Sequence, residues 1–209
     1  GASKFFAVET DPRVDALVAI LPGANCGGCG FPGCAGFAQA LVESKAELLA
    51  CNPGGNEVAQ KIGEILGRTV DAKTRQVGRL RCQGADGVAV PRLDYSGVDS
   101  CRAVMLVSPG GSKACPRACE GLGDCVRVCS FDAIKIGPNG LPVIDEEKCT
   151  ACGKCVGVCP KEVLVLDRYD SQLFLACHTD LSPKEARQAC EAACGACKLC
   201  LRACPYDAL

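Results

Sequence analysis

Cysteine is the residue type that could do chemistry in this chain, because 20 of its 209 residues are cysteines. Three of them fall in the loop Asn25–Cys34, NCGGCGFPGC, where glycines and one proline separate them. Thiolates ligate soft metal centres such as zinc and iron–sulfur clusters. Thiols this close in sequence point at one centre rather than at distant disulfide partners, and no secretory signal is visible. We therefore predict metal binding in a reducing compartment rather than a disulfide scaffold.

The opening loop supplies three predicted ligands of one [4Fe–4S] cluster, namely Cys26, Cys29 and Cys34. Cys51, which directly precedes Asn52 in the stretch CNPGG, is the expected fourth ligand. Glycine has no side chain and tolerates positive φ, so the glycines of this loop allow its backbone to approach the inorganic sulfides. The loop alone therefore predicts an iron–sulfur site.

The strongest signal is a run of four cysteines followed by Pro160, with the spacing C-x2-C-x2-C-x3-C-P. Bacterial two-cluster ferredoxins carry this run, and its fourth cysteine ligates the other cluster. An expanded run with Ser130 in place of the proline lies upstream. Zinc, the alternative, favours two separated cysteine pairs. We call this exchange of the fourth cysteine between two runs the crossing rule. It predicts one cluster on Cys115, Cys119, Cys125 and Cys159, and another on Cys129, Cys149, Cys152 and Cys155.

A third run of this spacing ends at Pro205, close to the last residue, Leu209. Its ligands would be Cys194, Cys197, Cys200 and Cys204. Either a C-terminal tail supplies the second half of this motif, or its partners come from the remaining cysteines. The remaining cysteines are Cys82, Cys101, Cys177 and Cys190, which we rank lower as ligands. The other interpretation is that they are free thiols, buried as small apolar side chains. We predict at least three [4Fe–4S] clusters and up to five.

The elements that position these cysteines divide the chain into predicted domains. Asp11 and Pro12 predict the start of a helix that runs to about Ile20, and a second helix is expected from Cys34 to about Leu49. Asn56 is the expected cap of a third helix, EVAQKIGEIL, which Gly67 ends. Residues 1–70 are therefore predicted to form a small helical [4Fe–4S] domain. Residues 71–112 are a connecting segment in strands or extended loops.

The remainder of the chain contains a repeat, whose copies are CVRVCSFDAI, CVGVCPKEVL and CLRACPYDAL. The segments IKI, LPVID and VLVL are predicted strands, and PNG is a turn. Cysteine loop, helical turn, strand, turn, strand and cysteine loop is the order of a two-cluster ferredoxin. We therefore expect an α+β chain with a two-cluster ferredoxin-like domain over 113–176 and a third ferredoxin-type motif over 177–209.

The motifs DPRVDALVAILPGANCGGCGFPGC, CEGLGDCVRVCSFDAI and CTACGKCVGVCPK, in this order, closely resemble the B subunit of the Rnf ion-translocating ferredoxin:NAD oxidoreductase complex. The resemblance runs over nearly the whole chain. It implies an electron-transfer subunit that accepts electrons from reduced ferredoxin and passes them to partner subunits. It further implies a place at the cytoplasmic face of the cell membrane, with an N-terminal membrane helix that is absent from this sequence.

Two other interpretations stay open at this point. One is a soluble polyferredoxin or reductive activator serving a cytoplasmic enzyme such as a corrinoid protein, and the other is a zinc-stabilised interaction module. We find no phosphate-binding loop and no nucleophile–histidine arrangement, so no substrate-converting site is predicted. A net charge of -1 disfavours a nucleic-acid-binding function. The basic stretch Lys73–Arg81 is either a solvated edge or a docking patch for ferredoxin, and the sole histidine, His178, is not expected to ligate.

Overall fold

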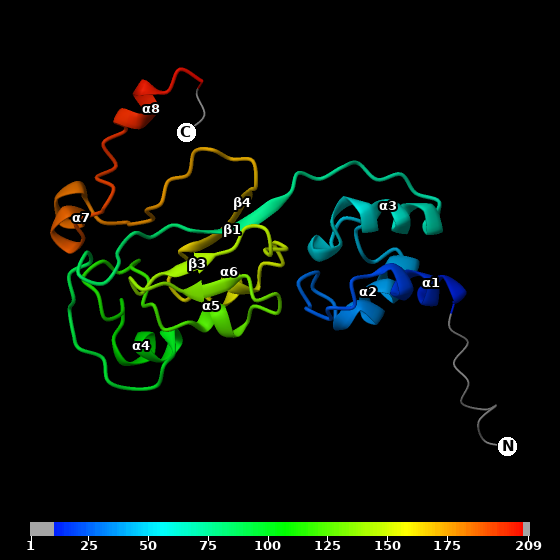
Figure 1. Ribbon diagram of the computed structural model, residues 1–209, viewed down its shortest axis with the longest axis horizontal. Helices are drawn as coiled ribbons and strands as arrows, with labels where there is room; N and C mark the ends of the chain where they lie inside the picture. The colour runs from blue at the N-terminus through cyan, green and yellow to red at the C-terminus, as the bar shows by residue number, and fades with distance from the viewer. Residues whose placement is uncertain (1–10, 207–209) are drawn as a thin grey trace. The chain divides into compact units, whose positions relative to one another are not determined.

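The computed structural model describes residues 11–206, and the chain divides into two compact units at residues 75 and 76 (Figure 1). Helices and two small sheets are both present, as the expected α+β class requires. The end of the third repeat, residues 207–209, lies outside the described residues. Within residues 11–206, the search for a helix with the length and apolar character of a membrane span finds none.

The first unit is helical, as predicted. Its elements are α1 (Pro12–Ile20), α2 (Gly33–Val42), the 3-10 turn η2 (Asn52–Gly54) and α3 (Gly55–Leu66). The predicted start of α1 is confirmed, because the Asp11 side chain accepts a hydrogen bond from the Arg13 amide at 2.9 Å and Pro12 occupies the first helical position.

The helix α2 is shorter than the predicted 34–49. Ser44 adopts a left-handed conformation with φ +57°, and the Lys45 amide donates to the Ala40 carbonyl at 2.8 Å, which closes the helix. The chain then reverses, so that Leu48 returns to the core with 8% of its surface exposed. Burial of Leu48 explains why the helix ends early, because a continuous helix would carry this side chain away from the other buried residues.

The helix α3 ends where the sequence predicts, at Gly67, which has φ +65°. Its beginning differs, because Asn56 lies inside the first turn and does not cap the helix. The Asn56 side chain instead accepts from the Lys73 amide at 2.8 Å and donates to the Lys73 carbonyl at 2.9 Å. This pair of bonds ties the segment after α3 back to the start of that helix.

A compact apolar core fixes the first cysteine loop. Leu17 and Ile62 are fully buried and Phe37 and Leu41 are 1% exposed, and they belong to one cluster from α1, α2 and α3. The partly buried cysteines Cys29, Cys34 and Cys51 pack against this cluster. The helical core therefore sets the positions of the thiols that lie on the loops around it.

The second unit contains two antiparallel two-stranded sheets. The predicted strands IKI, LPVID and VLVL correspond to β2 (Ile134–Ile136), β3 (Pro142–Ile144) and β4 (Leu164–Arg168). β2 pairs with β3, whereas β4 pairs with β1 (Gln76–Leu80) in a register that joins Gln76 to Arg168. The expected connecting segment thus supplies a strand to this unit, while the boundaries expected at 112 and 176 stay predictions.

Short helices of the second unit begin, contain or end at cysteines. Cys101 opens α4, Cys125 and Cys155 lie in α5 and α6, Cys190 directly follows α7, and Cys200 lies in α8. Figure 1 shows these helices as separate short coils connected by long irregular segments. Their bounds are Cys101–Val107 for α4, Asp124–Arg127 for α5, Lys154–Val158 for α6, Pro183–Ala189 for α7 and Leu199–Ala203 for α8.

The turn after α3 gives a stability prediction. A Cβ on Gly63 would lie 2.4 Å from the Arg68 carbonyl oxygen, a backbone atom that cannot move aside alone. We expect Gly63→Ala to lower the free energy of unfolding of the first unit by about 1–3 kcal/mol, although alanine normally favours helices. Anaerobic urea denaturation followed by far-UV circular dichroism measures this change.

Gly157→Ala in α6 is the matched control, since nothing lies within 4 Å of a Cβ at that position. We expect this substitution to be neutral or to stabilise the second unit by up to about 1 kcal/mol. An unchanged or higher midpoint for Gly63→Ala would show that the turn relaxes freely, contrary to the contact with Arg68.

Candidate metal centres

The described cysteines gather mostly in sets of four, which we name groups I to IV. Group I lies in the first unit, and groups II, III and IV each line a pocket of the second unit. Group I is Cys26, Cys29, Cys34 and Cys51; group II is Cys101, Cys119, Cys125 and Cys159; group III is Cys129, Cys149, Cys152 and Cys155; group IV is Cys82, Cys115, Cys177 and Cys190.

Group I has the membership that the sequence predicts. Burial is the main cause that raises the pKa of the Cys51 thiol, and the nearby charges of Cys29, Cys34 and Cys26 raise it further. Cys29, Cys34 and Cys51 also pack against the same apolar cluster, so these thiols surround one part of the helical core. Three of the group I cysteines come from the loop before and at the start of α2, and Cys51 comes from the turn before α3.

A single asparagine holds the group I loop in shape. Asn25 has φ +46°, and its side-chain oxygen accepts from the Cys34 amide at 2.8 Å, across nine residues. Gly33 has φ +79°, and a Cβ there would lie 2.9 Å from that same oxygen. Glycine is therefore required at position 33 both by its backbone conformation and by the approach of the Asn25 side chain.

Group III also has the predicted membership, with Cys129 crossing over to the three cysteines of the following run. The Gly78 amide, in β1, donates a hydrogen bond to the Cys149 sulfur at 3.2 Å. Burial, followed by the charges of Cys149, Cys152 and Cys125, raises the pKa of the Cys155 thiol to about 12. Without a metal this thiol is protonated at neutral pH, so a metal centre that binds it must displace the proton.

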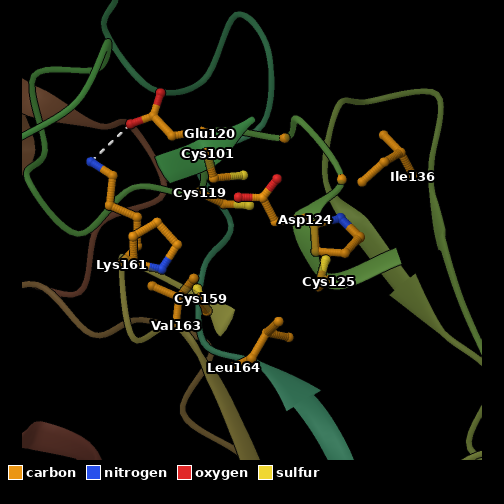
Figure 2. A pocket seen from close by; sticks show the side chains of 14 residues that line it. Cys101, Cys119, Glu120, Asp124, Cys125, Ile136, Cys159, Lys161, Val163 and Leu164 are labelled. Carbon is orange, nitrogen blue, oxygen red and sulfur yellow. Dashed lines mark ion pairs between the residues drawn. The ribbon is translucent and has the colours of Figure 1, made fainter. Parts of the chain in front are cut away.

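Group II differs from the predicted set, because Cys101 occupies the place expected for Cys115 (Figure 2). Burial is the largest cause that raises the pKa of Cys119 to about 12 and of Cys125 to about 11. The charge of Cys101 contributes to both shifts, and that of Cys159 contributes to the shift of Cys125. Cys115 lines a different pocket, that of group IV.

A buried carboxylate brings Cys101 to this pocket. Ser100 caps α4, and its hydroxyl donates to Asp124 Oδ2 at 3.2 Å. The same oxygen accepts from the Arg102 amide at 3.1 Å, and the Arg127 guanidinium also pairs with Asp124. Because Asp124 opens α5, these bonds join the starts of α4 and α5. The sequence signal that could have found Cys101 is Ser100, a preferred capping residue directly before an apolar run.

A buried ion pair lies on the wall of the same pocket. Lys161 Nζ and Glu120 Oε1 are 2.8 Å apart, and their side chains are 2% and 1% exposed (Figure 2). Lys161 also donates to the carbonyls of Gly110 at 2.7 Å and Pro116 at 3.0 Å, while Glu120 accepts from the Ser112 amide at 3.2 Å. Both charged groups thus have further hydrogen-bond partners, which a buried pair requires.

The third ferredoxin-like run lies around α8. The partners considered for it, Cys82, Cys101, Cys177 and Cys190, line the pockets of groups II and IV instead. Cys197 and Cys200 are exposed, and the Cys194 amide donates to the Cys177 sulfur at 3.4 Å. A hydrogen bond therefore connects this run to group IV.

One residue of the basic stretch, Arg79, is less available for docking than the composition suggests. Arg79 has a side chain that is 15% exposed and lies 3.6 Å from Glu146 and 3.8 Å from Asp167. Its guanidinium also stacks 5.6 Å from the centre of the Phe174 ring. These contacts favour the interpretation that Arg79 is a structural residue of β1.

Within residues 11–206, no three histidine, cysteine or acidic side chains lie close enough together to hold a single metal ion. The ligands of a [4Fe–4S] cluster bind separate irons, so they surround the cluster without meeting at one point. Residues 21–53 match the family model described as a putative Fe-S cluster, and residues 142–165 match the 4Fe-4S binding domain. The chain is thus an iron–sulfur protein by class.

Three curated relatives specify the family further. The chain is 45% identical over 92% of its length to the B subunit of the Na(+)-translocating ferredoxin:NAD(+) oxidoreductase complex of Acetobacterium woodii, of which it covers 58%. It is 39% identical over its whole length to the B subunit of the ion-translocating oxidoreductase complex of Methanosarcina acetivorans, covering 78% of that protein. The proton-translocating counterpart from Clostridium ljungdahlii is 39% identical over 92% of the chain, which covers 68% of it.

The chain therefore belongs to the family of B subunits of ion-translocating oxidoreductase complexes, as the sequence resemblance predicts. It spans 58% of the length of the Acetobacterium relative.

The buried ion pair gives a second stability prediction. Lys161→Met should lower the free energy of unfolding by about 3–5 kcal/mol, because it leaves the Glu120 carboxylate buried without its cation. The double variant Lys161→Met with Glu120→Leu should recover most of this loss. Urea denaturation under anaerobic conditions measures both changes.

Lys148→Met is the matched control, because Lys148 pairs with Asp145 at 3.7 Å on the surface with 62% of its side chain exposed. We expect a change within about 1 kcal/mol for this exposed pair. Equal losses for Lys161→Met and Lys148→Met would show that the buried pair has no special structural role.

Proposed function

We propose that this chain is an electron-transfer subunit that carries several [4Fe–4S] clusters, with groups I, II and III as ligand sets. The observation that carries the proposal is the convergence of four cysteines at each site from segments up to tens of residues apart in sequence. Four thiolates are the ligand set of a [4Fe–4S] cluster. The matches of residues 21–53 and 142–165 to iron–sulfur family models support the assignment.

We further propose that the second unit contains a two-cluster ferredoxin-like fold. The antiparallel pairs β1–β4 and β2–β3, with the cysteine-bearing turns α5 and α6 between the strands, support it. In this arrangement Cys129 leaves its own run and joins group III, while Cys159 leaves its run and joins group II. Through this reciprocal exchange, each of the two proposed clusters would be held by cysteines of both runs.

The residues of the chain bind, shield and tune the clusters. When bound, a [4Fe–4S] cluster accepts and releases single electrons. The thiolates hold its irons, and the Gly78 amide, which donates to the Cys149 sulfur at 3.2 Å, stabilises negative charge on group III. Burial of Cys119, Cys125 and Cys155 keeps water away from the proposed clusters. It also lowers the local dielectric constant, which is one of the factors that set the reduction potential of a cluster.

The relatives' names suggest the physiological setting. They describe subunits of ion-translocating oxidoreductase complexes, two of them acting between ferredoxin and NAD. We propose that this chain accepts electrons from reduced ferredoxin and delivers them to other subunits of such a complex, at the cytoplasmic face of a membrane. Attachment through an N-terminal helix is part of the same proposal and rests on the family resemblance.

Metal analysis of the full chain tests the cluster assignment. After anaerobic reconstitution we expect a brown protein with at least about 12 irons and an equal amount of acid-labile sulfide per chain, since three sites bind four each. Dithionite should bleach its visible absorbance. Cys29→Ser and Cys152→Ser should each reduce the iron content by about four, whereas the exposed control Ser96→Ala should not. A colourless protein containing zinc without sulfide would contradict the proposal.

Anaerobic mixing with a reduced bacterial ferredoxin tests the proposed donor. We expect the visible absorbance of the reconstituted chain to bleach as ferredoxin is oxidised. Apoprotein is the control and should leave ferredoxin reduced. Bleaching by dithionite but not by ferredoxin would remove ferredoxin as donor and leave the electron-carrier role intact.

A further inference from the structure

We propose that group IV, Cys82, Cys115, Cys177 and Cys190, is a further [4Fe–4S] site that lies outside the ferredoxin-type spacing and is assembled from four separate segments. The inference rests on the proposed function, because it assumes that the chain carries such clusters. None of these cysteines lies within the segments that match iron–sulfur family models.

The fold gathers the four thiols from distant parts of the second unit. Cys82 follows β1, Cys115 begins the expanded run, Cys177 lies in the long segment after β4, and Cys190 directly follows α7. All four line one pocket. Burial raises the pKa of Cys190, and the nearby charges of Cys82, Cys115 and Cys177 raise it further, which agrees with their close placement.

Backbone pairing brings Cys190 to Cys82. A capping box between Ser182 and Glu185 starts α7, and Cys190 ends it. The Val90 amide then donates to the Ala189 carbonyl at 2.9 Å, and the Glu191 amide donates to the Val88 carbonyl at 3.1 Å. These bonds flank Cys190 on both sides and attach it to the segment that follows Cys82.

Hydrogen-bond donors point at the sulfurs of this pocket. The amides of Gly84 and Cys119 each donate to the Cys82 sulfur at 3.4 Å. The Cys194 amide donates to the Cys177 sulfur at 3.4 Å. Amide donors of this kind stabilise thiolate ligands and raise the potential of the clusters that they hold. The thiols of this pocket therefore have the surroundings of ligands rather than those of inert apolar cysteines.

The remaining wall of the pocket includes two cationic side chains. Arg81 and Arg117 line it together with the four cysteines. Arg117 is held in place by Asp180 at 2.6 Å and by Glu162. Cationic side chains offset the negative charge that four thiolates concentrate in one place. This composition fits an anionic cluster, while His178 lies beside a complete set of four thiol ligands.

Group IV connects group II to the C-terminal run. Cys119 contributes its thiol to group II and its amide to Cys82 of group IV. Cys194, the first cysteine of the C-terminal run, contributes its amide to Cys177 of group IV. Electrons that reach group II thus have a short covalent and hydrogen-bonded route through group IV toward α8.

Differential alkylation of the reconstituted full chain tests the ligand set. Cluster-bound thiolates resist iodoacetamide, and mass spectrometry identifies the thiols that become reactive in each variant. Cys115→Ser should make Cys82, Cys177 and Cys190 reactive and reduce iron and sulfide by about four each per chain. Cys101→Ser, the paired variant, should instead expose Cys119, Cys125 and Cys159.

Glu191→Gln is the control, because Glu191 is exposed beside Cys190 and should change neither iron content nor reactivity. Continued protection of Cys149 and Cys152 in every variant shows that the second unit stays folded and loaded. The proposal is overturned if Cys115→Ser exposes Cys119, Cys125 and Cys159, as the ferredoxin crossing rule requires. It is also overturned if the group IV thiols react fully in the unsubstituted chain or form disulfides there.

The failure of this proposal differs from a failure of the proposed function. If group IV thiols react while those of groups I and III remain protected, only the additional site is lost. If all thiols react and no sulfide is present, the chain carries no cluster and the electron-transfer proposal fails with it.

Discussion

The structure depends on one constraint, which is that four thiols from different segments must meet in a place with little water. Burial of this kind raises the pKa of Cys119 and of Cys155 to about 12 in the absence of metal. Protonated thiols contribute little more than small apolar side chains, so the thiols themselves supply no strong interaction that holds their segments together. The proposed clusters would supply that interaction, because metal–thiolate binding is coupled to folding.

The second unit compensates for its short elements with buried polar links. Its strands have three or five residues and its helices have four to seven. Lys161 joins Glu120 and two carbonyls, and Asp124 joins α4 to α5. Both carboxylates belong to residues that neighbour a group II cysteine. The polar groups that hold the loops together are therefore the same ones that shape the proposed site.

The hydrogen bonds to sulfur also suggest how neighbouring sites communicate. One residue, Cys119, takes part in group II through its thiol and in group IV through its amide. With clusters bound in both groups, a change in charge at one would act on a ligand of the other. Cys119 can take part in both groups because its thiol and its backbone amide are separate groups. A relay built this way needs no additional residues between its centres.

Spacing along the chain determined the local features of this protein. Asp11 and Gly67 mark helix ends where predicted. Groups I and III consist of the cysteines that the sequence predicts to act together, because most of them share a single loop and one more cysteine joins each loop from a neighbouring turn. Only the tertiary structure decided that Cys101 joins group II while Cys115 joins group IV. That exchange depends on the Ser100–Asp124 bond and on the attachment of α7 to residues 88–90. Such long-range contacts leave no periodic trace in the sequence, since each is made by a few residues whose partners are set only when the chain folds.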